Sequence, residues 1–398
     1  MLAFQRLKCL AAVFAIAVSA GSFESRAAGF QSCIENLKAQ AINAGVDPRV
    51  AQAALSNVAY DEKVIRFSTS QPEYKTPIWD YMAFLVDDER ISDGKKMLRK
   101  YDRTLRAVER TYGVDRYVVL AVWGVESDYG QETGDFFVPH SLANLACAGR
   151  RAKYFRSELF EVLKIASRGD VALKDLNGSW AGAFGQTQFM PSTYRRLAVD
   201  FDGDKHADLV RSEADALAST ANYLRKAGWR KGEPWGFEVK IPRGYKGPSG
   251  RKRTASLSTW GKRGITALNG KRVGGGTKAA LLLPAGRNGP AFLTFRNFNA
   301  IYSYNVAESY ALAISHLSDR LKGQGAFSTA WPTNDPGLSR AQRLQLQKLL
   351  LRAGYDIGEP DGKVGPATRA GIKQAEARFG MTQTGRPGTK IYRALGGR

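Results

Sequence analysis

The sequence is poor in the residues from which metal sites and disulfide scaffolds are built. It has 3 cysteines and 3 histidines in 398 residues, and the histidines (His140, His206 and His316) are scattered along the chain. Because no spacing typical of a zinc site occurs, a zinc hydrolase is disfavoured. A chain of this length can also bury a sufficient hydrophobic core without cross-links.

Long apolar runs are scarce as well. The run CLAAVFAIAVSA over residues 9–20 is too short to span a bilayer. It follows the basic residues Arg6 and Lys8 and ends in small side chains, so we interpret residues 1–28 as a secretory signal peptide. The residues before Cys33 fit a lipid-attachment site poorly. We therefore expect a periplasmic protein that has no stable membrane anchor.

Acidic residues are outnumbered, with 37 acidic against 59 basic residues and a formal net charge of +22. A chain this basic often binds nucleic acid, but an exported protein does not meet nucleic acid in its normal work. Acidic partners outside the cytoplasm include lipid head groups and carboxylate-bearing polymers, so the charge favours association with such a surface. The most basic stretch, residues 240–253, either makes such contacts or is a solvated loop.

One carboxylate stands out from the rest of the chain. Glu126 closes the apolar run YVVLAVWGVESDYG over residues 117–130. The pattern predicts a helix from Asp115, a suitable N-cap residue, to Glu126, with Gly130 as the breaker that follows. Glu126 then lies on the same face as Trp123, one turn away.

Burial against Trp123 would raise the pKa of Glu126, because desolvation disfavours the charged form. The negative end of the helix dipole adds only about 0.3–1 kcal/mol, so desolvation should dominate. A carboxylic acid tuned in this way is the usual proton donor in glycoside cleavage. The alternative is a solvated glutamate at a helix end. The glycine-, amide- and aromatic-rich segment at 182–194 favours the first interpretation, since such a surface can hold a sugar.

Six motifs occur in order along the chain: VESDYG at 125–130, GRRAKYF at 149–155, SWAGAFGQTQFMPSTY at 179–194, DGDKHADL at 202–209, ANYLRKAGW at 221–229 and NFNAIYSYN at 297–305. Together they resemble the B family of membrane-bound lytic murein transglycosylases, in the branch with a C-terminal peptidoglycan-binding module. The resemblance covers roughly residues 30–322 for the catalytic part and 338–396 for the module.

The resemblance implies a reaction with a single carboxylate and no cofactor. Glu126 would protonate the oxygen between N-acetylmuramic acid (MurNAc) and N-acetylglucosamine (GlcNAc) in peptidoglycan. It would then deprotonate the muramic 6-hydroxyl, so that a 1,6-anhydro ring closes without water. One alternative is a hydrolytic muramidase that uses Asp128 as its second carboxylate. Residues two apart on a helix do not face each other, so Asp128 is better suited to cap the turn. A non-catalytic murein-binding protein is the third possibility.

The resemblance also places nine residues around the sugar groove: Ser179, Gln188, Phe189, Arg150, Arg151, Tyr154, Tyr304, Asn305 and Tyr310. The amide of Gln188 can donate and accept hydrogen bonds. Phe189 offers an apolar face to a pyranose ring, or else is ordinary core. The two arginines can pair with acidic groups of muramic acid or the stem peptide, although one of them could be a structural ion pair.

Two further features concern cross-links and cations. Signal removal leaves Cys33 and Cys147, an even number in an oxidising compartment, which predicts a disulfide between them. The segment 200–209 resembles a calcium loop with aspartates at positions 1, 3, 5 and 9. However, Lys205 replaces the usual glycine and Arg211 replaces the bidentate glutamate. The sequence leaves cation binding open.

The pattern of residue types along the chain predicts an α+β protein that is mainly α. We expect a lysozyme-like catalytic domain over residues 29–322, with a small β-rich insertion at 235–296. Residues 323–337 are small, polar and proline-rich, which is typical of a linker. The last segment, 338–398, reads as a three-helix peptidoglycan-binding domain. A flexible linker would let this module add affinity without taking part in the chemistry.

Overall fold

The structure is a computed structural model that describes residues 29–69 and 76–398. The predicted signal peptide at 1–28 lies outside the described residues. The chain divides into two compact units. Unit 1 contains residues up to 71 together with 132–216, and unit 2 contains residues 72–131 together with 217–398. Among the described residues, no helix combines the length and apolarity that crossing a membrane would require.

Unit 1 is built from helices packed around α8 (Val138–Ala148) and α9 (Ala152–Ser167). Both helices bury apolar side chains along their length. The helical stretch at 29–43 comes first in the described chain. The remaining elements of the unit are α2 (Pro48–Leu55), α3 (Glu62–Thr69), β1 (Phe136–Phe137), the 3-10 helix η2 (Leu173–Asp175), β2 (Asn177–Gly178) and α10 (Pro191–Leu197). The two short strands pair antiparallel, and a glycine-rich loop follows β2.

A disulfide joins Cys33 in the first described helix to Cys147 in α8, as the cysteine count predicts. The two Cα atoms lie 5.9 Å apart, and 114 residues of sequence separate the two cysteines. The bridge therefore ties the beginning of the described chain to the central helix of unit 1.

Loss of this disulfide is expected to lower the free energy of unfolding by about 2–4 kcal/mol, because a long loop is no longer closed in the unfolded state. The double variant Cys33→Ala, Cys147→Ala, compared with the oxidised wild type by urea denaturation, measures the loss. Titration of the unreduced protein should find neither of these two thiols free. Two reactive thiols at these positions would contradict the assignment.

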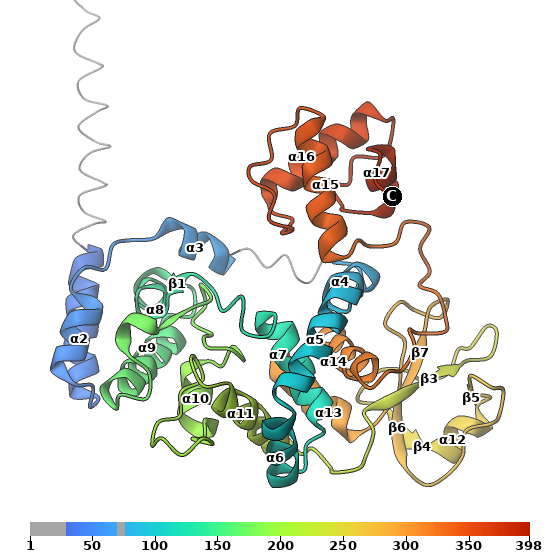
Figure 1. The fold of residues 1–398 in the computed structure, drawn as a ribbon, viewed down its shortest axis with the longest axis horizontal. Coiled ribbons are helices and arrows are strands. Elements are labelled where there is room, and N and C mark those ends of the chain that lie inside the picture. Colours follow the sequence, from blue (N-terminus) through green and yellow to red (C-terminus); the bar gives the residue numbers. More distant parts are fainter. Residues whose placement is uncertain (1–28, 70–75) are drawn as a thin grey trace, which may run out of the picture. The chain divides into compact units, whose positions relative to one another are not determined.

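The helices of unit 2 surround α7 (Arg116–Ser127), which packs against α5 (Asp88–Lys100), α6 (Asp102–Tyr112) and α14 (Glu308–Leu321). Figure 1 shows α5, α7 and α14 lying side by side, although α14 is almost 200 residues away in sequence. The other helices here are α4 (Ile78–Leu85), α11 (Glu213–Lys226), which continues from unit 1, and α13 (Arg296–Asn305). Helix α7 buries every residue from Val118 to Gly124, and α14 buries every residue from Tyr310 to Leu317.

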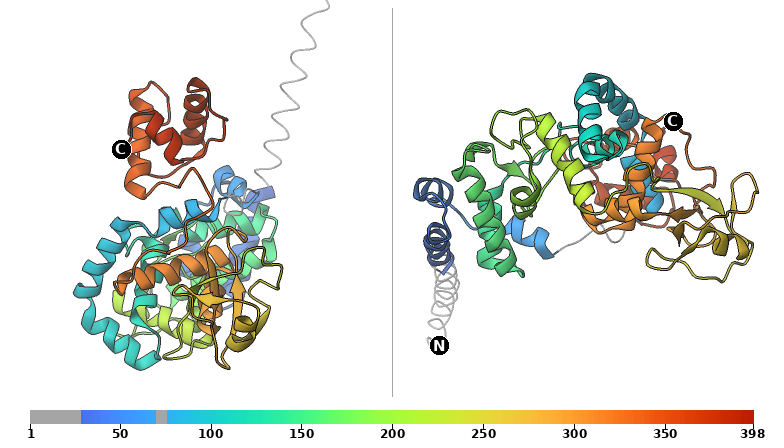
Figure 2. Two further views of the ribbon diagram at one scale, coloured as in Figure 1. Left: turned by 90° about the vertical axis from the view of Figure 1, so that its right-hand side faces the viewer. Right: turned by 90° about the horizontal axis from the view of Figure 1, so that it is seen from below.

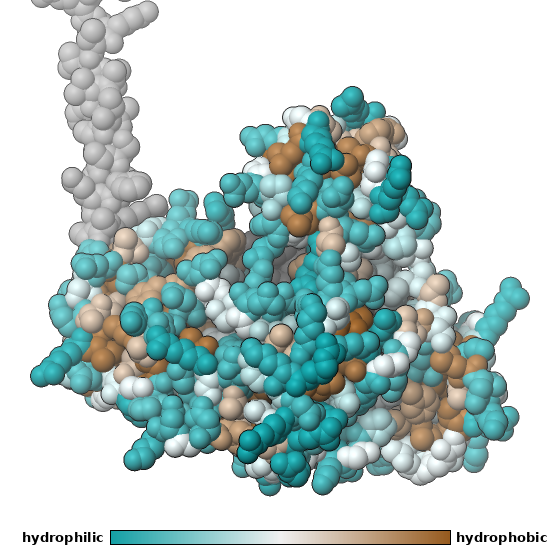
Figure 3. Space-filling view, viewed as in Figure 1, coloured by the Kyte–Doolittle hydropathy of each residue, from teal (hydrophilic) through white to brown (hydrophobic). Residues whose placement is uncertain are grey.

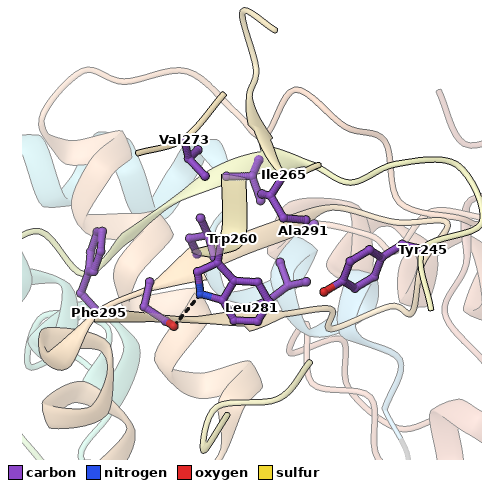
Figure 4. Packing of buried hydrophobic residues seen from close by; sticks show 10 residues of the cluster. Tyr245, Trp260, Ile265, Val273, Leu281, Ala291 and Phe295 are labelled. Carbon is purple, nitrogen blue, oxygen red and sulfur yellow. Dashed lines mark hydrogen bonds between the residues drawn. The ribbon is translucent and has the colours of Figure 1, made fainter. Parts of the chain in front are cut away.

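A five-stranded antiparallel sheet occupies the segment predicted as β-rich. Its order is β4-β6-β7-β3-β5, and α12 (Leu257–Lys262) follows β4. The strands are β3 (Gly236–Lys240), β4 (Thr254–Ser256), β5 (Thr266–Ala267), β6 (Lys278–Leu282) and β7 (Ala291–Thr294). Figure 1 shows α12 beside β4 and β5, and the right view in Figure 2 shows the yellow strands of the sheet gathered together. Trp260 anchors its core, and its indole N–H donates to the carbonyl of Ala279 at 2.8 Å (Figure 4).

The last residues form the predicted three-helix module from α15 (Arg340–Arg352), α16 (Pro366–Arg378) and α17 (Thr389–Ala394). Leu346, Leu350 and Ile372 are fully buried within it. A capping box begins α15, because Ser339 and Gln342 exchange side-chain and backbone hydrogen bonds. The mainly helical α+β class is thus confirmed. Apolar side chains also appear among the hydrophilic surface of this module (Figure 3), and Leu351 and Phe379 are its exposed large hydrophobic residues.

The segment 323–337 is packed rather than free, which corrects the expectation of a flexible linker. The ring of Phe327 stacks on buried His316 with centroids 3.8 Å apart and contacts Phe292 at 4.7 Å. The backbone N–H groups of Ser328 and Thr329 donate to the carboxylate of Glu238 at 2.7 and 2.8 Å. The C-terminal module therefore follows a segment that is fixed to α14 and the sheet.

Candidate active site

Helix α7 carries the predicted catalytic carboxylate and begins where the sequence indicates. The carboxylate of Asp115 accepts a hydrogen bond from the backbone N–H of Tyr117 at 2.9 Å and so caps the N-terminus. The helix ends at Ser127, one residue beyond the predicted end, and Asp128 rather than Gly130 is the first residue in the left-handed conformation (φ 52°, ψ 48°). Glu126 therefore lies in the last turn of a helix whose other residues are mostly buried.

The carboxyl group of Glu126 is held by a tyrosine from a distant helix. The hydroxyl of Tyr310, on α14, donates to Oε1 of Glu126 at 2.5 Å. Tyr310 itself is 1% exposed, and burial raises its pKa well above the ordinary value, so it stays a donor. Desolvation raises the pKa of Glu126 to about 7, against a smaller opposite effect of the Tyr310 hydrogen bond. The predicted direction and its predicted main cause are both confirmed.

Two more aromatic rings extend this arrangement. Tyr304, near the end of α13, stacks on Tyr310 with centroids 6.2 Å apart and an interplanar angle of 13°. Tyr223, on α11, packs against Tyr304 at 4.8 Å and donates its hydroxyl to the carbonyl of Ser303 at 2.7 Å. The sequence resemblance includes Tyr304 and Tyr310 among the site residues but not Tyr223. Asn305, the third predicted residue here, is the exposed last residue of α13.

Asp128, the other carboxylate near Glu126 in sequence, is engaged by two arginines. Its Oδ2 accepts from Nη1 of Arg340 at 2.6 Å, and its Oδ1 lies 3.6 Å from Nη2 of Arg90. Its backbone N–H also caps α7 through the carbonyls of Gly124 and Trp123. The structure therefore gives Asp128 the capping role that the sequence favours.

In unit 1, the glycine-rich loop places Ser179 and Gln188. The Ser179 hydroxyl accepts from the backbone N–H of Ala183 at 3.0 Å. Gln188 has a positive φ of 51°, and its side-chain nitrogen donates to the carbonyls of Thr133 at 2.8 Å and Gly185 at 3.0 Å. These bonds use both amide hydrogens and fix the side chain, which leaves its carbonyl oxygen as the group that can accept from a ligand.

Of the four remaining predicted sugar contacts, three are exposed or half-buried, and the fourth is buried. Arg150 and Arg151 are exposed beside half-buried Tyr154, and the guanidinium of Arg151 lies 4.1 Å from the centroid of the Tyr154 ring. Both arginines line one pocket with Tyr154. Phe189, in contrast, is only 2% exposed. Its ring is core, so it does not offer a stacking surface to a sugar in this structure.

The acidic loop after α10 gathers three of its four candidate ligands. Asp200, Asp202 and Asp204 are exposed, and each offers a carboxylate oxygen within 4.8 Å of the others. Asp208 is not in this group, because its Oδ1 accepts from the backbone N–H groups of Val210 and Arg211. The side chain of Arg211 pairs with Asp175 instead. The three aspartates can hold a cation, but the loop lacks the bidentate glutamate of a full calcium loop.

The raised pKa of Glu126 predicts that Glu126→Gln stabilises the fold at alkaline pH. Below pH 4.5, the ordinary value, both folded and unfolded states carry the proton and the carboxyl costs nothing. Between pH 4.5 and 7 only the unfolded state ionises, so stability is lost as pH rises, and above pH 7 the full cost of about 3 kcal/mol remains. Glutamine removes this cost.

Urea denaturation of the wild type and Glu126→Gln at pH 5 and pH 8 measures the difference. The gain in the free energy of unfolding should be clearly larger at pH 8. The exposed residue Glu359 supplies a matched control, and Glu359→Gln should give the same difference at both pH values. A pH-independent effect of Glu126→Gln would contradict a raised pKa.

Comparison with known proteins shows the family to which the chain belongs. Residues 29–319 match the model of the transglycosylase SLT domain family, and residues 339–395 match that of a putative peptidoglycan binding domain. The chain belongs to the transglycosylase SLT domain family. It is a lytic transglycosylase with a lysozyme-like fold, an enzyme that acts on peptidoglycan.

Individual proteins similar to this chain support the family assignment. The crystal structure of SltB3 from Pseudomonas aeruginosa in complex with NAG-anhNAM-pentapeptide is 41% identical, covers 92% of this chain and 99% of its own, and has a TM-score of 0.75. Membrane-bound lytic murein transglycosylase B of Escherichia coli (strain K12) is 31% identical over 287 residues, 69% of this chain and 78% of that protein. Escherichia coli Slt35 in complex with calcium is 30% identical, covers 73% of this chain and 92% of its own, and has a TM-score of 0.65.

Proposed function

We propose that this chain cleaves the β-1,4 bond between MurNAc and GlcNAc in periplasmic peptidoglycan, with Glu126 as both acid and base, and leaves 1,6-anhydro-MurNAc ends. The observation that carries the proposal is the Glu126 carboxyl group itself. Burial raises its pKa to about 7, so near neutral pH it can both give and take a proton. Tyr310 fixes its orientation through the 2.5 Å hydrogen bond.

The reaction needs no other carboxylate. Protonated Glu126 donates its proton to the glycosidic oxygen, the bond from that oxygen to C1 of MurNAc breaks, and GlcNAc leaves as an alcohol. Positive charge develops at C1, where the 2-acetamido group of the sugar can stabilise it. The 6-hydroxyl of the same sugar then attacks C1, and the Glu126 carboxylate accepts the hydroxyl proton. The carboxyl group is regenerated and no water is consumed.

The environment of Asp128 argues against the hydrolytic alternative. A general base or nucleophile must reach water or the sugar, whereas the Asp128 carboxylate is engaged by Arg340 at 2.6 Å and by Arg90 at 3.6 Å. Such pairing holds the carboxylate in place and away from the role of a free base. A non-catalytic wall-binding protein is disfavoured too, because it would have no use for a carboxyl group with a pKa near 7.

The proposed substrate contacts come from the glycine-rich loop and from the helices. We propose that Ser179, the carbonyl oxygen of Gln188, Tyr304 and Asn305 contact the sugars. Exposed Arg150 and Arg151 would pair with carboxylates of muramic acid or the stem peptide. The complex of SltB3 with NAG-anhNAM-pentapeptide supports a substrate of this class. The proposed periplasmic location places the enzyme beside this polymer.

The reducing ends of the products test the reaction type. An anhydro ring ties up the anomeric carbon of MurNAc, so these ends cannot be reduced by borohydride, whereas hydrolysis leaves reducible MurNAc. Purified sacculi digested with the full chain should yield muropeptides whose chromatographic mobility does not change after borohydride treatment. Muropeptides from a hydrolytic muramidase serve as the positive control for reduction. Reducible MurNAc ends in the digest would overturn the proposal.

A further inference from the structure

The first helix of the C-terminal module reaches the turn that ends the catalytic helix. Arg340, the first residue of α15, donates from Nη1 to Oδ2 of Asp128 at 2.6 Å. Its Nε and its backbone N–H also donate to Oδ2 of Asp87 at 3.1 and 3.0 Å. One side chain thus joins the module to the N-cap of α5 and to the C-cap of α7, two residues after Glu126.

The charges of this cluster balance only when Arg340 is present. The side chains of Asp87 and Arg90 are 2% and 5% exposed, and those of Asp128 and Arg340 are 18% and 19% exposed. Arg90 lies 3.6 Å from Asp128, and within the described part of the chain its Nε and Nη1 make no hydrogen bond. Without Arg340, two carboxylates would face one cation, and a buried charge without a partner is strongly destabilising.

The turn that Arg340 holds is conformationally demanding. Asp128 and Tyr129 are consecutive non-glycine residues with φ of 52° and 60°, a conformation that L-residues adopt only at a cost. Tyr129 fits closely over Gly124, where a Cβ atom would lie 2.6 Å from its ring, and its hydroxyl donates to the carbonyl of Arg90 at 2.8 Å. Such a turn persists only where its surroundings determine it, and Arg340 supplies a direct hydrogen bond to it.

We propose that Arg340 is a positioning residue for the reaction: it holds Asp128, and through it the last turn of α7, so that Glu126 keeps its place. The peptidoglycan-binding module is then part of the working enzyme and not only a tethered affinity device. This inference rests on the proposed role of Glu126. It replaces the expectation that the module adds affinity without taking part in the chemistry.

Other contacts keep the module docked when Arg340 changes. Arg386 pairs with the 4%-exposed carboxylate of Asp80 at 2.5 Å and also with Asp335. The guanidinium of Arg343 lies 4.3 Å from the ring of Phe84, on α4. A substitution at Arg340 therefore tests the contact with Asp128 rather than docking as a whole.

The test uses the full chain and a short soluble muropeptide, with kcat and KM measured for the wild type, Arg340→Gln, Asp128→Asn and the double variant. We expect kcat to fall about tenfold in each single variant, because small displacements of a catalytic group are costly. KM and binding to intact sacculi should stay within about twofold, since the module remains docked. The double variant should be no slower than either single variant, because both changes break one contact. Arg340→Lys, which keeps the charge, should recover part of the loss.

Arg352→Gln is the matched control, because Arg352 is exposed on the same helix, and its kcat should equal that of the wild type. Unchanged kcat in Arg340→Gln would overturn the inference, as would losses that multiply in the double variant. If Arg340→Gln does not fold, Asp128→Asn alone decides in the same way. A wild type that makes no anhydro product would instead overturn the proposed function, so the two failures are distinguishable.

Discussion

Glu126→Gln is expected to lower kcat by about 10²–10⁴-fold, the range that a general acid or base contributes. Glutamine keeps the size of the side chain and can still accept the hydrogen bond from Tyr310, but it has no proton to deliver to the glycosidic oxygen. The variant should remain folded and should bind sacculi as the wild type does. Release of soluble muropeptides from purified sacculi, with a pull-down assay on the same protein, measures both quantities.

Asp128→Asn is the comparison that separates one carboxylate from two. It should cost far less than Glu126→Gln, because Asp128 orients a turn through Arg340 and does not transfer a proton. An equal loss in both variants would favour the hydrolytic reaction with two acids. Substantial turnover by folded Glu126→Gln would remove Glu126 from the mechanism altogether.

Tyr310→Phe should change both the rate and its pH dependence. A hydrogen bond to a charged group is worth about 1.5–3 kcal/mol, so kcat/KM should fall by roughly 10–100-fold. The Tyr310 hydroxyl lowers the pKa of Glu126, so its removal moves this pKa upward from about 7. Because the first step needs the protonated acid, the decline of kcat/KM at alkaline pH should shift to higher pH in the variant.

The control for this variant is Tyr392→Phe, which removes a hydroxyl that donates to the carbonyl of Arg398 at 3.1 Å in the C-terminal module. Its pH profile should match that of the wild type. If Tyr310→Phe lost activity but kept the alkaline limb in place, Tyr310 would be packing rather than tuning the carboxyl group.

The catalytic helix could be predicted from sequence because its signals are local. An N-cap at Asp115, an apolar face and the position of Glu126 beside Trp123 all lie within a dozen residues. The main cause of the raised pKa followed from the same pattern, since an acid at the end of a buried helix is desolvated. The partner of that acid did not follow from this pattern, because Tyr310 is 184 residues away and only the packing of α14 on α7 brings it to Glu126.

Other features of the structure could not be predicted from the sequence for similar reasons. Small, polar and proline-rich residues are typical of a free linker, but the same composition suits an extended segment that packs through a few aromatic rings, as Phe327 does on His316. Phe189 illustrates a second limit, because a ring in a sugar-site motif and a ring in the core look alike in sequence. Arg340 lies 212 residues from Asp128, in what reads as a separate domain, so no local pattern could connect them.

Digestion of sacculi in water enriched in ¹⁸O tests most directly whether one carboxylate works without water. The muropeptides should have the mass of anhydro-MurNAc ends, one water lighter than hydrolysed products, and should carry no ¹⁸O at the cleaved bond. Glu126→Gln under the same conditions should release almost nothing. MurNAc ends that carry one ¹⁸O atom in the wild-type digest would show that water attacks the sugar, and they would contradict the account.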